Sequence, residues 1–282
     1  MSSHDFIIDQ IVFSYSSLNT YYTCPYSFKL NYIDKRDKLE NFFGQYGSLI
    51  HDTIFQYFSD KLDVYELTGY FLENYDKVMT SPPPPYPAGM EAKYKEGGIE
   101  FFNNFSFDKS KYDIKLMEEK IDVELENGLK FVAKPDLVLF NKEMGTFALM
   151  DYKTSAPFRV DKRSGKEIVD KKKLEGYYTQ MYLYTYSLRN FLFTPIDHIV
   201  LWFTRPEKHL TVLWNEEHEK QAVAWLLETV EKIKADEEFI PCDVVKNNYF
   251  CRNLCSVRES CEYKLEVPLD LTRSNNYAII QE

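Results

Sequence analysis

The residues best able to do chemistry lie in two short stretches near the middle of the chain. The stretch TFALMDYKTS at 146–155 places an acid, Asp151, two positions before Lys153, directly after an apolar run. The stretch LKFVAKPDLVLF comes just before it and carries Asp136. Two converging carboxylates repel each other unless a cation lies between them, and hard oxygen ligands suit Mg²⁺ or Mn²⁺. Such a metal would polarise a phosphate and acidify a bound water, which a neighbouring lysine would orient.

An Asp-x-Lys pattern alone is a weak signal, because it occurs three times, beginning at Asp113, Asp151 and Asp170. A surface salt bridge at the end of a strand is the plainer interpretation of any one of them. Only the pattern at 151 ends an apolar strand and follows a second strand that carries Pro135-Asp136. Residues two apart in a strand share a face, so Asp151 and Lys153 are expected to point the same way. A hairpin through 141–145 would bring Asp136 alongside them.

The elements that must position these residues follow from hydrophobic periodicity and turn signals. Segments 115–125, 129–140 and 146–155 are predicted to be consecutive antiparallel strands, and Asn127-Gly128 predicts a hairpin between the first two. Two more strands are predicted at 198–204 and 209–214. Helices are predicted at 13–33 (broken at Cys24-Pro25), at 43–79 starting from Gly47, and at 91–104, 174–191 and 215–236. The proline-rich stretch 81–90 is predicted to be an irregular loop.

This order of elements predicts an α/β fold in which helices flank a small mixed β-sheet. We expect a single domain over 1–282. Its predicted parts are a mainly helical region at 1–110, a core at 111–236 and a cysteine-bearing segment at 237–282 that closes onto the N-terminal region.

The chain has five cysteines, Cys24 near its start and Cys242, Cys251, Cys255 and Cys261 near its end. An odd number in an intracellular protein indicates metal ligands or free thiols, because disulfides are rare there. Four thiolates satisfy either tetrahedral zinc or an iron–sulfur cluster.

Composition limits the partners. The formal net charge of −10 argues against a protein that coats DNA, although the run 159–173 holds seven Lys or Arg and would grip a phosphate backbone locally. No segment approaches the length of an apolar membrane span, and the first residues lack the layout of a signal peptide, so we expect an intracellular protein without a membrane partner. No Gly-x₄-Gly-Lys-Ser/Thr loop is present. Any unwinding of DNA would therefore come from a helicase or recombination partner in trans, or the substrate is already single-stranded.

Together these motifs resemble the core of the PD-(D/E)XK nuclease superfamily, in its RecB-like branch. That branch carries Gly-x-x-Asp, then Asp-x-Lys, then Gln-x-x-x-Tyr on the next helix, with a histidine ligand upstream. The matching positions are Ala133 to Asp136, Asp151 to Lys153, Gln180 to Tyr184, and His51 in GSLIHDTIFQYF. One departure is Ala133 in place of the glycine, a position that has no chemical role in the family.

The resemblance implies a metal-dependent deoxyribonuclease with the restriction-endonuclease-like core of that superfamily. It favours an exonuclease that acts on single-stranded DNA or DNA ends in recombination, repair or viral genome processing. The implied metal ligands are His51, Asp136, Asp151 and the backbone carbonyl of Tyr152. The implied catalytic residues are Asp136, Asp151, Lys153, Gln180 and Tyr184, the last two orienting Lys153 or the phosphate.

The cysteines resemble those of AddB-type nuclease domains and CRISPR-associated exonucleases, where one cysteine before the core and three after it bind a [4Fe–4S] cluster. The context of Cys24, with Pro25, Phe28 and Tyr32, matches that pattern. The implied ligands are Cys24, Cys251, Cys255 and Cys261. The gap from Cys251 to Cys255 is one residue longer than is usual in the family, so Cys242 stands as a substitute for Cys251, and zinc as an alternative to the cluster.

Two other functions stay open. One is a non-catalytic subunit that binds DNA ends with the same fold, against which the intact acids and lysine argue. The other is a zinc-stabilised protein-interaction module, which the sequence pI of ≈ 5.2 would suit. Neither the oligomeric state nor the polarity of cleavage follows from these residues.

Overall fold

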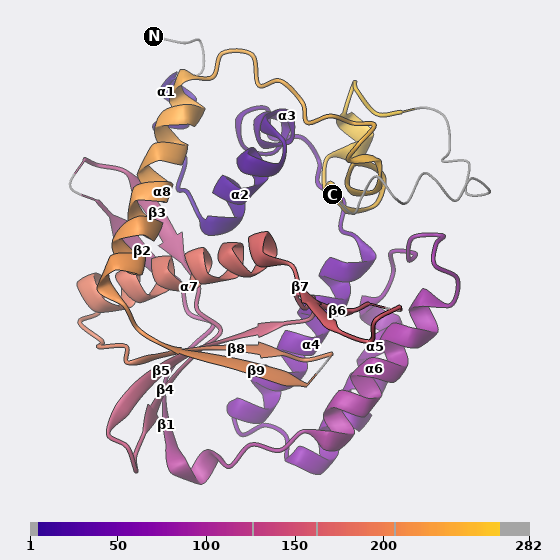
Figure 1. Cartoon of the computed structure of the whole chain (residues 1–282), viewed down its shortest axis with the longest axis vertical. Helices are drawn as coiled ribbons and strands as arrows, with labels where there is room; N and C mark the ends of the chain where they lie inside the picture. The colour runs from indigo at the N-terminus through magenta and orange to yellow at the C-terminus, as the bar shows by residue number, and fades with distance from the viewer. Residues whose placement is uncertain (1–4, 126, 162, 206, 266–282) are drawn as a thin grey trace.

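The computed structural model describes residues 5–265 apart from positions 126, 162 and 206 (Figure 1). Its centre is a five-stranded sheet in the order β1-β4-β5-β8-β9. The strands are β1 (Tyr112–Met117), β4 (Leu137–Asn141), β5 (Thr146–Lys153), β8 (His198–Phe203) and β9 (Lys208–Leu213). Strands β5 and β8 run parallel and the other neighbours antiparallel. The sheet is therefore mixed and, with helices on both faces, confirms the predicted α/β class.

Two further hairpins stand apart from this sheet, one of β2 (Ile121–Glu124) and β3 (Lys130–Ala133), the other of β6 (Phe158–Val160) and β7 (Glu167–Val169). The predicted turn at Asn127-Gly128 joins β2 to β3, and Gly128 supplies the positive φ of 76° that this turn needs.

The prediction of three consecutive antiparallel strands is wrong in one respect. Segments 115–125 and 129–140 each divide between the two sheets, so β1 pairs with β4 while β2 pairs with β3. The first break falls at Glu118, whose φ of 53° ends the extended conformation, and the second at Pro135, which cannot donate to a ladder.

The N-terminal helices are α1 (Asp5–Ile8), α2 (Tyr15–Thr23) and α3 (Pro25–Phe28), followed by a π-helical turn over Lys29–Ile33. A capping box begins α2, because the side chains of Ser14 and Ser17 each accept the other's backbone N–H. Cys24 ends α2 and caps α3 by accepting the N–H of Ser27 at 3.4 Å. The helical segment 13–33 is thus broken at the predicted residues.

The other long helices are α4 (Phe42–Phe58), α5 (Leu67–Val78), α6 (Met90–Asn104), α7 (Lys171–Phe191) and α8 (Glu216–Ala235). The predicted helical segment 43–79 divides into α4 and α5, with the chain leaving the α-helical conformation between Phe58 and Leu67. Helix α4 begins at Phe42 because the side chain of Asn41 accepts the N–H of Gly44 at 3.0 Å and caps it. Short helical turns lie at Val64–Glu66, Lys109–Lys111, Phe250–Leu254 and Arg258–Ser260. The proline-rich segment is irregular until α6 begins at Met90.

Alternate residues of the sheet face two separate hydrophobic cores. Leu149 and Leu201 face the first core, which α7 and α8 cover, whereas Met150 and Trp202 face the second core, which α4, α5 and α6 cover. Figure 1 shows α7 across one side of the sheet and α4, α5 and α6 gathered on the other. The strict alternation assigns each residue of β5 to one helical layer or the other.

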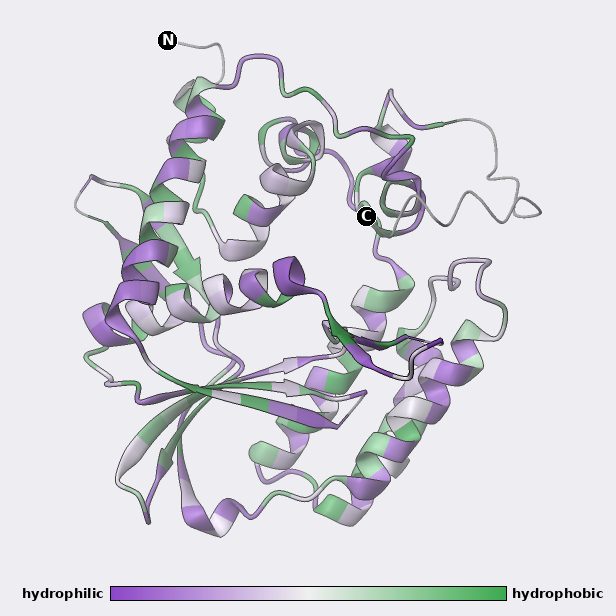
Figure 2. Ribbon diagram, in the orientation of Figure 1, coloured by the Kyte–Doolittle hydropathy of each residue, from purple (hydrophilic) through white to green (hydrophobic). Residues whose placement is uncertain are grey.

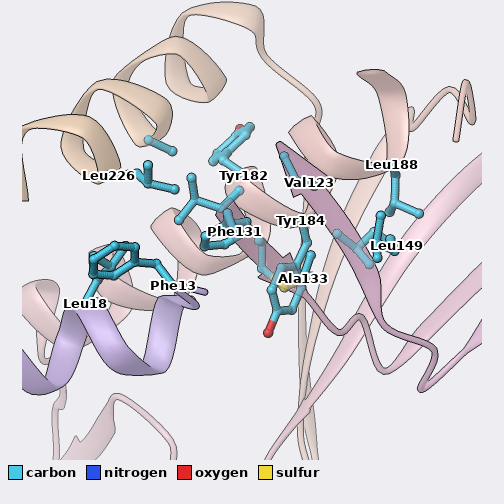
Figure 3. Packing of buried hydrophobic residues seen from close by; sticks show 14 of the residues in the cluster. Phe13, Leu18, Val123, Phe131, Ala133, Leu149, Tyr182, Tyr184, Leu188 and Leu226 are labelled. Atoms are coloured by element: carbon cyan, nitrogen blue, oxygen red, sulfur yellow. The ribbon is translucent and has the colours of Figure 1, made fainter. Parts of the chain in front are cut away.

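Polar and apolar residues are distributed accordingly. Hydrophilic and hydrophobic residues alternate along α6 and α8, each of which has one face toward solvent (Figure 2). Figure 3 shows part of the first core, where Phe131 and Ala133 of β3 lie among Phe13, Leu18 and Tyr184. Ala133, the residue in place of the family glycine, is fully buried there.

The close packing of α5 against α6 gives a matched pair of stability predictions. A Cβ added at Gly98 would lie 2.3 Å from Cζ of the fully buried Phe71, whereas one added at Gly97 meets nothing within 4 Å. We expect Gly98→Ala to lower the free energy of unfolding by about 2 kcal/mol. We expect Gly97→Ala to raise it by about 0.5–1 kcal/mol, since alanine is the better helix former. Urea unfolding of both variants checks this, and equal effects would contradict the packing.

Among the described helices, none combines the length and the apolar character needed to cross a membrane. The division of the chain into parts stays a prediction, and the end of the segment 237–282 lies outside the described residues.

Candidate active site

The predicted acids and lysine meet where β4 begins and β5 ends, between the two helical layers. The register pairs Leu137 with Met150, so continuing it by one step sets Asp136 opposite Asp151. Asp151 then lies on the same face of β5 as Leu149, the face that α7 covers, whereas Asp136, in the bend just before β4, meets His51 of α4. Hairpin pairing therefore gathers two carboxylates that are 15 positions apart in the sequence.

Asp136 is held in place by the backbone of the neighbouring strand. Its Oδ2 accepts the N–H of Tyr152 at 2.8 Å, and its Oδ1 lies 3.5 Å from Nδ1 of His51. The carboxylate therefore has one oxygen tied to β5 and the other turned toward the imidazole.

A continuous polar chain runs from Asp151 to helix α7. Nζ of Lys153 lies 2.6 Å from Oδ2 of Asp151 and donates to Oε1 of Gln180 at 2.7 Å. The side chain of Gln180 in turn donates to the hydroxyl of Tyr184 at 2.9 Å. Because Gln180 and Tyr184 are four residues apart, they share one face of α7, and that face meets the end of β5.

His51 reaches the same point from the opposite layer. It lies on α4, which packs on the second core, and its Nε2 is 3.0 Å from the backbone carbonyl oxygen of Tyr152. The structure thus brings together all the residues that the motifs singled out for this site. Their chemical roles stay predictions.

Charge is unequally distributed over these groups. Burial and the neighbouring Asp136 raise the pKa of Asp151 to about 6, against the opposing effect of Lys153. Burial alone would raise the pKa of Asp136, but His51, Lys153 and the Tyr152 N–H lower it below its usual value. Burial disfavours charge on His51, yet the two aspartates outweigh it and raise its pKa to about 9. The two aspartates together thus favour a positive charge at this point, which a bound cation would also supply.

The sequence patterns missed one acid, Glu118. Its Oε1 lies 3.8 Å from Nδ1 of His51, and the ligand atoms of His51, Glu118 and Asp136 all lie within 4.8 Å of one another. Its own N–H donates to the carbonyls of Pro135 and Asp136, each at 3.1 Å. The left-handed backbone conformation of Glu118 allows these hydrogen bonds to form. No sequence motif indicates that conformation.

A divalent cation fits this arrangement on structural grounds. The buried Oδ2 of Asp151 has its ion pair with Lys153 but accepts no aligned hydrogen bond from the described residues. A cleft of about 520 Å³ opens in front of His51, Glu118 and Asp136, and Gly47 and Lys134 also line it. Asp151 is buried and is not among the residues that line this cleft. Carboxylate oxygens with one imidazole suit Mg²⁺ or Mn²⁺.

We expect Glu118→Gln to weaken Mn²⁺ binding by about tenfold, because it removes one negative charge from the cleft. Isothermal titration of the purified chain with Mn²⁺ measures this. Glu119→Gln is the matched control, since Glu119 is adjacent and exposed and should leave the affinity unchanged. An equal loss of Mn²⁺ affinity in both variants would show that the affinity depends only on the net charge of the protein.

We expect Gln180→Ala to lower the rate of DNA cleavage by roughly 10–100-fold while Mn²⁺ affinity stays the same. Gln180 touches Lys153 and Tyr184 rather than the acids, so its removal frees the lysine without altering the carboxylates. Gln221→Ala is the control, because that glutamine bonds only Glu217 on the surface of α8. A parallel loss of metal affinity would contradict a purely orienting role.

A second candidate site is formed by the cysteines. All five line one cavity, together with Ser27, Arg258 and Lys264. Sγ of Cys24 accepts the N–H of Cys242 at 3.4 Å. The cavity therefore joins Cys24, near the start of the chain, to the segment that follows α8, and its donor set fits a thiolate-bound metal group.

The spacing of the sulfurs bears on the kind of metal group. Tetrahedral zinc, with Zn–S bonds of about 2.3 Å, brings its thiolates to about 3.8 Å from one another. Within the described part of the chain, which includes every cysteine, no three sulfurs lie within 4.8 Å of one another. One pair, Cys242 and Cys251, has the sulfur spacing of tetrahedral zinc at 3.8 Å, but no third sulfur joins it within the described residues.

The class of protein is one in which a mixed sheet gathers two aspartates and a lysine near an imidazole, next to a cleft suited to a divalent cation. A family model described as the PD-(D/E)XK nuclease superfamily matches residues 12–262. The match spans most of the chain, and the protein belongs to this superfamily. Its class of function is therefore that of a nuclease that uses divalent metal ions.

Other similarities are weaker. A solved structure titled "Crystal structure of SSO0001" aligns over 78% of this chain and 85% of that one, with 13% sequence identity and a TM-score of 0.32. No curated protein matches the chain.

Proposed function

We propose that this protein is an exonuclease that hydrolyses single-stranded DNA or DNA ends, using Mg²⁺ or Mn²⁺ held by His51, Asp136 and Asp151. The observation that carries the proposal is that His51 and Asp136 meet at one cleft, while Asp136 lies opposite Asp151, which is paired with Lys153. The backbone carbonyl of Tyr152 and the carboxylate of Glu118 face the same point. The bound cation would polarise the scissile phosphate and lower the pKa of a bound water.

Side chains of the protein would position the attacking water and the phosphate. Lys153 carries the ammonium group nearest to Asp151, and Gln180, steadied by Tyr184, fixes its direction. An ammonium held in this way orients an attacking water and stabilises negative charge that develops on the phosphate. Asp136, fixed by the Tyr152 N–H, keeps its other oxygen available to a cation.

DNA contact is proposed for the basic segment between β5 and α7. Arg159, Arg163 and Lys166 are exposed on the β6–β7 hairpin. The segment that leads into the hairpin is held next to the site, because the hydroxyl of Tyr177 donates a hydrogen bond to the carbonyl of Ser155 at 2.6 Å. Cations at this point neutralise phosphates that flank the scissile bond, in spite of the net negative charge of the chain.

We further propose that the cysteines hold a [4Fe–4S] cluster, as in the iron–sulfur branch of RecB-like nucleases. Support comes from the common cavity that all five cysteines line, and from the match of Cys24 and its neighbours to the pattern of that branch. The biological setting we propose is recombination, repair or viral genome processing. A helicase or recombination partner would supply single strands, since the sequence has no Gly-x₄-Gly-Lys-Ser/Thr motif.

Digestion of end-labelled linear and circular single-stranded DNA, with Mg²⁺ and Mn²⁺ in turn, tests the proposal. We expect linear strands to shorten from one end while circles survive, and the position of the label gives the polarity. Cleavage of circles at the same rate would make the protein an endonuclease. Binding of ends without cleavage in either metal would instead favour a non-catalytic end-binding subunit.

A further inference from the structure

The cysteine cavity holds one more thiol than a four-thiolate group needs. The five cysteines are not equivalent, because Cys24 and Cys255 are buried while Cys242, Cys251 and Cys261 are partly exposed. The five thiols can therefore be distinguished by their burial, which bears on the question of which one is in excess.

Two of the sulfurs lie side by side. Sγ of Cys242 is 3.8 Å from Sγ of Cys251, near van der Waals contact. Thiolates on different irons of a cubane cluster are held apart by the body of the cluster, at more than this distance. Cys242 and Cys251 therefore cannot occupy two corners of one cluster as they stand, although either sulfur can occupy one.

The buried thiols are anchored differently. Sγ of Cys24 accepts the N–H groups of Ser27 and Cys242, each at 3.4 Å. Sγ of Cys255 lies 3.5 Å from the hydroxyl of Ser27, and its side chain packs with Leu30 and Val257. These two sulfurs are fixed in the cavity wall, which leaves Cys242 and Cys251 as the neighbouring, accessible pair.

We propose that Cys242 and Cys251 share one coordination position of the metal group, either sulfur filling it, and that a disulfide oxidant joins them and so closes the position. The inference rests on the proposed cysteine-bound metal group. In the oxidation step a small disulfide such as oxidised glutathione is reduced to two thiols. It takes up the two electrons and two protons that the cysteines lose as their S–S bond forms.

The segment between the two cysteines suits this pairing. The carbonyl of Asp243 accepts the N–H of Asn247, and the carbonyl of Asn247 accepts the N–H of Cys251, both at 2.9 Å. These helical turns bring Cys242 and Cys251 together although nine positions separate them. Closing the S–S bond thus needs local side-chain movement rather than refolding.

Ligand sharing is tested by reconstituting the full chain anaerobically with ferrous iron and sulfide. Iron, acid-labile sulfide and visible absorbance are measured in Cys242→Ser, Cys251→Ser, the double variant, and Cys255→Ser as the matched control. We expect each of the first two to keep most of its iron, and the double variant to lose it as fully as Cys255→Ser does. Complete loss in one single variant, or retention in the double variant, overturns the shared position. If the wild-type chain takes up zinc instead, the zinc content of the same variants tests the shared position in the same way.

Oxidation is tested on the metal-free full chain with oxidised glutathione, followed by alkylation and trypsin without reduction. Trypsin cuts after Lys29, Lys246, Arg252, Arg258 and Lys264, so the five cysteines fall in five different peptides. We expect one dominant cross-link, between peptides 235–246 and 247–252. Cross-links spread over Cys24, Cys255 or Cys261, or glutathione left attached to Cys242, overturn the pairing.

These results separate the inference from the proposed nuclease. A chain that binds neither iron nor zinc overturns the shared ligand position even if it cleaves DNA in Mn²⁺. A chain that assembles the cluster in the expected pattern but cuts no DNA supports the ligand assignment and refutes the nuclease.

Discussion

Asp151→Asn is expected to abolish DNA cleavage and at the same time to stabilise the metal-free protein. We expect the cleavage rate to fall by at least roughly 10²–10³-fold, because a carboxylate beside both the cation and Lys153 is lost. The gain in stability follows from the pKa of about 6 that Asp151 has in the folded protein, against its usual value of 3.8. A buried carboxylate that resists ionisation destabilises the folded state at neutral pH.

The pH dependence of this effect has a definite sign. Below about pH 4 the carboxyl is protonated in both states, so it favours neither. Between about pH 4 and pH 6 the unfolded chain loses its proton first, and the free energy of unfolding falls as the pH rises. Above about pH 6 the penalty is complete, at most about 3 kcal/mol, and the asparagine variant lacks it.

Thermal unfolding in EDTA at pH 5 and pH 7.5, together with a cleavage assay in Mn²⁺, measures both effects. We expect the stability advantage of the variant to be larger at pH 7.5, and Mn²⁺ to stabilise the wild type more than the variant. Asp113→Asn is the control, because it alters the same Asp-x-Lys pattern at a partly exposed ion pair in β1. Loss of cleavage in both variants, or a less stable Asp151→Asn protein at pH 7.5, would contradict the site as described.

Cys255→Ser is expected to release the segment that follows α8. Scattered hydrogen bonds attach this segment to the N-terminal region. The N–H of Leu39 donates to the carbonyl of Ser256 at 2.7 Å, and Asn41 donates to that of Leu254 at 3.3 Å. The hydroxyl of Ser256 donates to Asn31 at 3.0 Å, and Arg258 donates to the carbonyl of Glu40 at 3.3 Å.

Among the described residues, the small core around Cys255 has two other buried hydrophobic members, Leu30 and Val257, with Tyr26, Phe250 and Cys261 partly buried against it. With the cysteine-bound metal group proposed above, most of the segment's stability is expected to come from the thiolate–metal bonds rather than from this small core.

Limited trypsin digestion measures this release. We expect cleavage after Lys246, Arg252 and Arg258 to become roughly a hundredfold faster, which corresponds to about 2.7 kcal/mol of local stability. The core that contains β5 and α7 should remain resistant, since it has its own buried residues. Ser260→Ala, close to the cysteines but not a thiol, should digest like the wild type. Unchanged digestion of Cys255→Ser would show that the metal group does not hold the segment.

Local patterns predicted much of the site. That Asp151 and Lys153 share a face follows from the two-residue period of a strand, and that Gln180 and Tyr184 share one follows from the period of a helix. Both depend only on backbone geometry within a few residues. The association of these pairs with each other and with His51 came instead from resemblance to a family, because no local rule relates positions so far apart.

Glu118 and Cys242 show where such patterns fail. Glu118 reaches the cleft only because its backbone is left-handed and because β1 pairs with β4, two features that no run of residue types reveals. Cys242 lies outside the expected spacing of the cysteine motif, yet its sulfur is the neighbour of Cys251. No local sequence pattern relates the residues that meet in either of these contacts.

By itself, the sequence determined the mixed α/β class, the hairpin at Asn127-Gly128 and the acids and lysine that end a buried strand. These depend on short-range periodicity and turn chemistry, which a few neighbouring residues settle. Only the tertiary structure decided that β1 and β2 enter different sheets, that Glu118 joins the acids, and that five thiols surround one cavity. Packing between distant segments decided these features, because the sheet register and the layering of helices fix which side chains meet.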